Sequence, residues 1–351
     1  MTNATPRSKL AAFHPASATD AKRAAYGIPP LPASNAELRQ RWVDAFGGPA
    51  GVVAARLAPS LRLRSHPRMN STVNGQGTAP NWSGAEVRPP SGNTISVAVS
   101  GVWNVPQVVS LGPGSGAQYV AVWIGVDGAS EGQPLLQAGI SATVLPASAP
   151  VYSAWAEWLS ATVAVPPQEI ANFSVNAGDS VEVQIWMTSS TTATAVMRKL
   201  NSNEATVIVP VGNPANAQIL GLTAEWIVER PTLGFLSDGQ PILATLADYS
   251  PPVVFTQARA WAQAGSDGSL SLNAYANRHG VPLPASTLGM AAVVGLPQPV
   301  SLRALLEETV TVDAGSGSTI TMTATDGSAL STASVLGGES IQCGYVGPQA
   351  S

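Results

Sequence analysis

Residues 223–231 read TAEWIVERP, a run in which two glutamates stand among apolar side chains. Successive side chains of a β-strand point to opposite faces, so Glu225, Ile227 and Glu229 share one face and Trp226 lies on the other. A buried strand tolerates carboxylates only where they are paired or used. The alternation therefore predicts a strand with one apolar face and one face that carries chemistry.

Similar runs recur on both sides of this stretch, separated by clusters of Gly, Pro, Asn and Asp. They are TISVAVSGVWNVP (94–106), QYVAVWIGVDG (118–128), PLLQAGISATV (134–144), VYSAWAEWLSATV (151–163), DSVEVQIWMTSS (179–190), EATVIVPV (204–211) and VVFTQARAWAQ (253–263). The 351 residues include 33 Gly and 29 Pro, and no strand–helix alternation is visible. We therefore predict an all-β fold, a sandwich of two antiparallel sheets of concanavalin or jelly-roll type.

Charge divides the chain into a basic head and an acidic body. Residues 1–70 carry a balance of +7, whereas residues 71–351 carry −11. We expect the two parts to attract each other, and a body without a basic patch argues against nucleic acid as a partner. Residues 1–75 are predicted to be a mostly irregular pro-segment, and residues 76–351 the sandwich domain.

One short helix is predicted in the head, within SNAELRQRWVDAFGG (34–48). Ser34 and Glu37 have the spacing of a capping box. The side chains of Leu38, Trp42 and Phe46 recur every four residues and form an apolar stripe, and Gly47 is expected to end the helix.

Several classes of protein are disfavoured by what the sequence contains. Cys343 is the single cysteine, so no intrachain disulfide can form, and three scattered histidines make a transition-metal site unexpected. No apolar run reaches the ~18 residues of a membrane span. The first residues show no continuous apolar segment of signal-peptide type.

The remaining candidates for chemistry are polar and aromatic side chains on strand faces. Trp123 shares a face with Asp127, and Trp155 shares one with Glu157; Gln137 stands in a third run. If these faces join that of Glu225 and Glu229, they form a tryptophan-walled cleft suited to an extended polymer, peptide or sugar. Each residue also has a plain structural interpretation: tryptophans pack in cores, Asp127 forms a turn, and Gln137 satisfies a backbone partner.

Eight motifs in register resemble the glutamic peptidases, or eqolisins (peptidase family G1). They are NWSGA (81–85), WNVP (103–106), VWIGVDG (122–128), LLQAG (135–139), YSAWAEW (152–158), NAGDSV (176–181), TAEWIVE (223–229) and YSPPVVFT (249–256). The resemblance runs from about residue 81 to about residue 260.

The resemblance implies a β-sandwich endopeptidase that acts in acid, needs no metal or cofactor, and cleaves polypeptides. The family's catalytic glutamine falls on Gln137 and its catalytic glutamate on Glu229, with Glu225 as a supporting residue. Trp82 and Trp123 match positions that line the family's groove.

The same resemblance gives less specific expectations for the remaining site residues, the location of the protein and the role of the basic head. Asp127 and Glu157 are further groove or supporting candidates, although Glu157 can equally be a structural carboxylate. We also expect a secreted, extracellular monomer with no membrane partner, in which the basic head inhibits the groove and is removed at low pH. Leu159 stands where fungal members often have an aromatic residue, so substrate preference is expected to differ.

Two other functions fit the same residues. A glycoside hydrolase would use Glu157 and Glu229 as its carboxylate pair. A lectin-like sandwich would bind its ligand without turnover. Gln137 discriminates between them, because only the peptidase depends on its amide. Subsite specificity, optimum pH, export route and the role of the tail after about residue 262 do not follow from the sequence.

Overall fold

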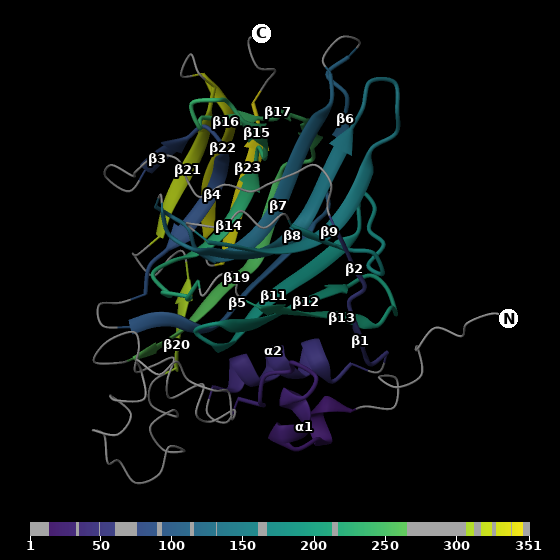
Figure 1. Cartoon of the computed structure of the whole chain (residues 1–351), viewed down its shortest axis with the longest axis vertical. Coiled ribbons are helices and arrows are strands. Elements are labelled where there is room, and N and C mark those ends of the chain that lie inside the picture. The colour runs from purple at the N-terminus through teal and green to yellow at the C-terminus, as the bar shows by residue number, and fades with distance from the viewer. Residues whose placement is uncertain are drawn as a thin grey trace, which may run out of the picture.

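The computed structural model describes residues 14–32, 35–48, 50–59, 76–89, 93–112, 116–130, 132–160, 167–212, 217–264, 307–311, 317–324, 328–337 and 339–346. Most of these residues lie in strands that stack as two layers, with the helices of the head on one side (Figure 1). We call the layer next to the helices the back sheet and the other layer the front sheet.

The back sheet is built around the longest strands of the chain. Its order is β1 (Val52–Ala54), β13 (Thr206–Gly212), β12 (Thr192–Lys199), β11 (Ser180–Ser189), β5 (Asn93–Asn104), β19 (Val253–Ala264) and β20 (Glu307–Thr311). The strand β12, which the sequence runs did not single out, pairs with both β11 and β13.

The front sheet contains the strands that carry the candidate residues. Its order is β2 (Leu57–Pro59), β10 (Gln168–Ile170), β9 (Val151–Leu159), β8 (Leu135–Val144), β7 (Gln118–Asp127), β14 (Ala224–Glu229), β4 (Trp82–Val87), β21 (Gly317–Thr323), β22 (Ala329–Gly337) and β23 (Ser340–Tyr345). Strand β3 (Gln76–Ala79) pairs with β21, and β17 (Thr245–Leu246) pairs with the start of β7. Two small ribbons lie outside both layers: β15 (Thr232–Phe235) with β16 (Pro241–Leu243), and β6 (Gln107–Val109) with β18 (Asp248–Ser250).

The predicted sandwich is confirmed in outline but differs in how its sheets are connected. Strand β19 pairs with β23 of the front sheet through its first residues and with β5 of the back sheet through its later ones, so the two layers are continuous. The register shifts between Thr256 and Arg259, where Gln257 has a φ of 53°, and such an irregularity bends a strand. The pairs β1–β13, β3–β21 and β7–β17 are parallel. A concanavalin or jelly-roll connectivity stays a prediction.

The core between the layers follows from period-two alternation. Val122, Ile124 and Val126 of β7 point into it, as do Val183 and Ile185 of β11. The intervening residues of β7 point to the outer face of the front sheet, which we call the front face. The intervening residues of β11 point to the outer face of the back sheet, which we call the back face.

The head packs on the back face. Helix α2 (Ala36–Phe46) buries the predicted stripe of Leu38, Trp42 and Phe46 against Trp186 and Trp261. The capping-box assignment is wrong by one residue: the N-cap is Asn35, whose side chain accepts a hydrogen bond from the backbone N–H of Leu38 at 2.9 Å. Gly47 ends the helix as expected.

The head is more ordered than the sequence indicated. It also contains a 3₁₀ turn (Pro15–Ser17) and helix α1 (Asp20–Ala24), and its strands β1 and β2 join the back and front sheets respectively. Arg41 of α2 lies 3.3 Å from Glu182 on β11, and Glu37 of α2 pairs with Arg259 on β19. Residues 60–75, which include Arg62, Arg64 and Arg68 of the expected pro-segment, lie outside the described residues.

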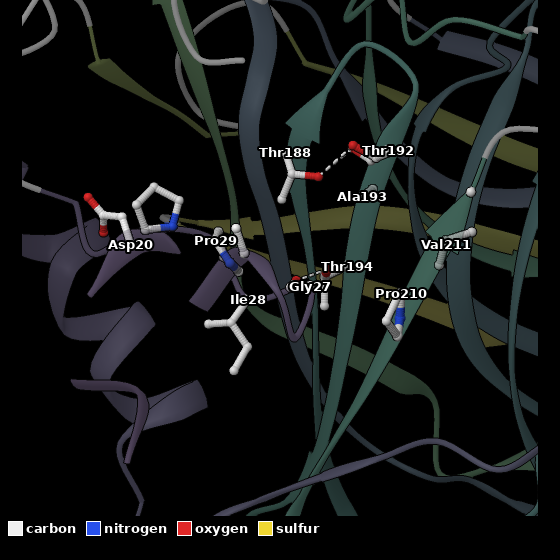
Figure 2. A pocket seen from close by; sticks show the side chains of 13 residues that line it. Asp20, Gly27, Ile28, Pro29, Thr188, Thr192, Ala193, Thr194, Pro210 and Val211 are labelled. Carbon is white, nitrogen blue, oxygen red and sulfur yellow. Dashed lines mark hydrogen bonds between the residues drawn. The ribbon is translucent and has the colours of Figure 1, made fainter. Parts of the chain in front are cut away.

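A pocket of about 380 Å³ lies at the seam between the head and the back sheet. Figure 2 shows Ile28 and Pro29 of the head on one side and Thr188, Thr192 and Thr194 of the back sheet on the other. Within this seam the Thr194 hydroxyl donates to the carbonyl of Gly27. The pocket is separated from the front face by both sheets.

The tail completes the sandwich. Strands β20 to β23 extend the back sheet by one strand and the front sheet by three, which answers what the residues after 262 contribute. The sequence SLSLNAY (269–275) also predicts a strand, but it lies outside the described residues.

Candidate active site

The candidate residues meet on the front face because five neighbouring strands hold them in register. Across the sheet, Glu225 of β14 stands opposite Gly125 of β7, Gly125 opposite Gln137 of β8, and Gln137 opposite Glu157 of β9. Residues directly opposite each other in a sheet point to the same side. Glu229 lies four residues further along β14 and therefore shares this face.

Gln137 and Glu157 form a buried pair. The Nε2 of Gln137 donates a hydrogen bond to Oε2 of Glu157 at 2.9 Å. The pair fixes the orientation of the amide, because only its nitrogen can donate to a carboxylate. The Oε1 atom of Gln137 has no partner among the described residues. An N–H and a carbonyl oxygen of this amide are thus free to bind something else.

Glu229 is held by a tryptophan. The indole Nε1 of Trp123 donates to Oε2 of Glu229 at 2.8 Å, and both side chains are fully buried. The ring of Trp82 meets that of Trp123 edge-on, with centroids 5.0 Å apart and planes at 78°, an arrangement that aromatic pairs prefer. Trp82 stands directly opposite Glu229 on β4.

Trp123 lies between the glutamine and the glutamate. Its Nε1 reaches Glu229, while its ring carbon Cζ3 would be only 2.8 Å from a methyl group on Gly125, in the row of Gln137. Gly139 sits beneath it, where a Cβ would lie 2.2 Å from the carbonyl oxygen of Val122. The glycines leave the room that this indole occupies.

Glu225 differs from Glu229 in its surroundings. No described residue donates a hydrogen bond of ordinary length to either of its carboxyl oxygens. Burial raises the pKa of Glu225 well above its ordinary value. The neighbouring Asp127 and Glu86 raise that pKa further, whereas the hydroxyl of Thr223 and the guanidinium of Arg88 lower it.

Asp127 holds the loop that enters β14. Its carboxyl oxygens accept hydrogen bonds from the backbone N–H groups of residues 220–222, at 2.7, 3.1 and 2.8 Å. Its backbone has a φ of 66°, so the structural interpretation as a turn residue agrees with this geometry. Burial raises the pKa of Asp127 to about 6, although the backbone N–H groups act in the opposite direction.

Comparison with known proteins identifies the family. The Peptidase A4 family model matches residues 80–279, more than half of the chain. The chain belongs to the Peptidase A4 family. The resemblance to the glutamic peptidases is thereby confirmed, and the protein is a glutamic endopeptidase. No curated protein sequence matches the chain significantly.

The chain is also similar to solved structures of glutamic peptidases. A scytalido-glutamic peptidase with a transition state analog inhibitor is 22% identical, with a TM-score of 0.51 over 76% of this chain and 98% of that chain. The aspergilloglutamic peptidase from Aspergillus niger is 21% identical, with a TM-score of 0.43 over 65% of this chain and 99% of that chain. The first of these likenesses shows the fold.

In this peptidase the structure brings most of the predicted site residues onto one face. Trp82, Trp123, Gln137, Glu157, Glu225 and Glu229 all lie on the front face, and Asp127 supports the loop beside it. Gln137 and Glu229 are each bonded to a different partner, Glu157 and Trp123. In the part of the chain that the structure describes, no group of three or more His, Cys, Asp or Glu is placed to hold a metal ion.

Sequence reasoning missed Glu86 of the peptidase. This buried residue stands directly opposite Glu225 across the β4–β14 pair. The signal was present in NWSGAEV (81–87), where Trp82 and Glu86 are four positions apart and so share a face of a strand.

Proposed function

We propose that this peptidase hydrolyses peptide bonds with Gln137 and Glu229 as its catalytic pair. The observation that carries the proposal is that each residue is fixed on the front face by its own buried hydrogen bond, on either side of Trp123. Attack of water on a peptide bond requires two pre-organised groups. A carboxylate accepts the proton of the water, and an amide stabilises the negative charge that develops on the carbonyl oxygen.

Glu229 acts as the general base in this mechanism. Its Oε2 accepts a hydrogen bond from the indole of Trp123, and in the reaction the carboxylate accepts a proton from the attacking water. The carboxyl then returns the proton to the departing amine. The hydrogen bond from Trp123 fixes the orientation of this carboxylate.

Gln137 stabilises the oxygen that becomes negative in the tetrahedral intermediate. One N–H is bonded to Glu157, and the other is available to donate to that oxygen. The unpartnered Oε1 positions the attacking water by accepting one of its hydrogens. Glu157 is in this view a positioning residue, since it orients the amide without touching the substrate.

Point variants and a protein digest test this function. Gln137→Ala and Glu229→Gln are each expected to lower kcat about 100- to 1,000-fold on a denatured protein between pH 2 and 6, because each removes one catalytic group. Glu229→Gln still accepts the Trp123 hydrogen bond, so its fold is preserved. Glu169→Gln, on β10 between β2 and β9, is the matched control and is expected to keep full activity. Near-normal kcat in Glu229→Gln, or loss of activity on adding a chelator, contradicts the proposal.

We also propose that the full chain is a secreted precursor that acid activates. Gln137 and Glu229 have no exposed surface in the full chain, so a substrate cannot reach them before the molecule opens. The described helices of the head lie on the back face and not over these residues, and they are bound there partly through Arg41–Glu182 and Glu37–Arg259, ion pairs that weaken when carboxylates are protonated. Full activity at pH 3–4 with an intact N-terminus would refute this. None of the described helices has the length and apolar character to span a membrane.

A further inference from the structure

Three buried carboxyl groups lie together at the start of β14. Glu86 stands opposite Glu225 across β4–β14, and Asp127 ends the neighbouring strand β7, two residues from the position opposite Glu225. None of the three is more than 1% exposed. Side chains directly opposite each other in a sheet have Cβ atoms about 4.5–5.5 Å apart, and like charges there repel.

In the part of the chain that the structure describes, the positive charge paired with this cluster is that of Arg88. Arg88 lies 3.4 Å from Glu86, but its side chain is 58% exposed, so solvent screens its charge. The charged or titratable side chains that act on Glu225 are Glu86 and Arg88 from β4 and Asp127 from β7. The residue of β8 in the same row is the uncharged Gln137, and the residues of β21 beside β4 carry no charge.

Glu182 on the back sheet shows the opposite arrangement in the same molecule. It is equally buried, yet it is paired with both Arg41 and Arg198 and accepts a hydrogen bond from Gln184. A buried glutamate that must be ionised is thus surrounded by cations in this fold. Glu225 has no hydrogen bond of ordinary length from the described residues and lies near two other carboxyl groups, so its surroundings favour the neutral form.

The cluster lies on and beside the strand that carries Glu229, the proposed general base. Glu225 and Glu229 are both in β14, all six residues of which pair with β4. The carboxylate of Asp127 binds the loop 220–222 that leads into this strand. A force between Glu86 and Glu225 acts on the pair β4–β14, in which Glu229 stands opposite Trp82.

We propose that Glu86, Glu225 and Asp127 form a protonation-dependent clamp on β14, which keeps Glu229 in place while Glu225 is neutral and releases it when Glu225 ionises. The three are positioning residues, and the clamp sets the upper pH limit of activity. The inference about activity rests on the proposed role of Glu229; the inference about stability does not.

The direction of the pH effect follows from the pKa shifts. The folded-state pKa values of Glu225 and Asp127 both lie above the values of exposed carboxyls, so both groups favour folding in acid. Their contribution is complete below the ordinary value of 3.8 for Asp127 and is lost as pH rises through its folded value of about 6. Ionisation of Glu225 extends this loss of folding stability to higher pH.

The test compares Glu86→Gln with the wild type. The substitution keeps the shape of the side chain but removes the charge opposite Glu225. In the pH profile of kcat/KM, we expect the fall at high pH (the high-pH limb) to shift to higher pH by about one unit. At pH 4 the kcat/KM of the variant should stay within about threefold of the wild-type value. The thermal midpoint is expected to rise at pH 7 and to change little at pH 4.

Two further variants make the result specific. Glu225→Gln should move the limb in the same direction, and its inactivity at every pH would make Glu225 catalytic and overturn the clamp. Glu182→Gln, a buried glutamate held by arginines, should lower the thermal midpoint at pH 7 and leave the limb unchanged. An unchanged limb and midpoint in Glu86→Gln overturn the proposal. If the wild type showed no peptidase activity at all, the thermal comparison would still decide the clamp.

Discussion

At the scale of single residues, the site depends on one indole. Trp123 combines three relations: a hydrogen bond to Glu229, an edge-on contact with Trp82, and a close fit over Gly125 and Gly139. The first is chemical, because it acts on the base itself. The other two place the ring so that the first can form.

Trp123→Phe separates the chemical relation from the packing. The phenyl ring keeps much of the contact with Trp82 but cannot donate to Glu229. A hydrogen bond to a charged group contributes about 1.5–3 kcal/mol, so kcat/KM is expected to fall about 10- to 100-fold. Trp158→Phe is the matched control, since its Nε1 has no partner in the described part and its ring lies in the core between the sheets. Equal kcat/KM values for the two variants would show that the indole N–H has no role.

At the scale of elements, alternation was sufficient for the strands that carry the site. The runs around Trp123, Gln137, Glu157 and Glu229 became β7, β8, β9 and β14, since each has one apolar face for the shared core. The apolar stripe of α2 was equally predictable from the sequence. These features are local, and a local pattern suffices to predict them.

Other features depend on contacts between distant segments, and the sequence could not provide them. Strand order makes Glu86 the neighbour of Glu225, and the same order decides that Trp123 bonds Glu229. The bend in β19 that joins the layers appears only where both layers compete for its edges. Asn35 displaced Ser34 as the cap because both residue types suit that position.

The close approach of β7 and β8 yields a prediction at this scale. In Gly139→Ala, the added methyl group would meet the Val122 carbonyl oxygen at 2.2 Å and the Trp123 Cβ at 2.5 Å, so the two strands must separate. We expect a loss of about 3 kcal/mol or more in the free energy of unfolding, measured by denaturant titration. Gly212→Ala on β13 has nothing within 4 Å of the new Cβ and should change stability by less than about 0.5 kcal/mol. A small change in the free energy of unfolding for Gly139→Ala would mean that β7 and β8 can move apart beneath Trp123 at little cost.

At the scale of the whole molecule, the head is attached in two chemically different ways. Its ion pairs, Arg41–Glu182 and Glu37–Arg259, weaken in acid. Its apolar contacts do not titrate: Trp42 and Phe46 are fully buried against the back sheet. Strand β1 adds backbone hydrogen bonds at the edge of β13, which are also independent of pH. Acid therefore loosens the head without removing what anchors it.

This difference predicts what becomes of the head after activation. If acid exposure at pH 3–4 cuts the chain between the head and β4, the fragment that carries α2 should stay bound to the sandwich. Each buried large apolar side chain contributes about 1.5–3 kcal/mol to that association. Size-exclusion chromatography with mass spectrometry of the eluted peak measures retention directly. In a Trp42→Ala variant the fragment should dissociate, because the apolar anchor is lost while the ion pairs are intact. Elution of the wild-type fragment as a separate species would show that the ionic contacts, and not the apolar stripe, hold the head in place.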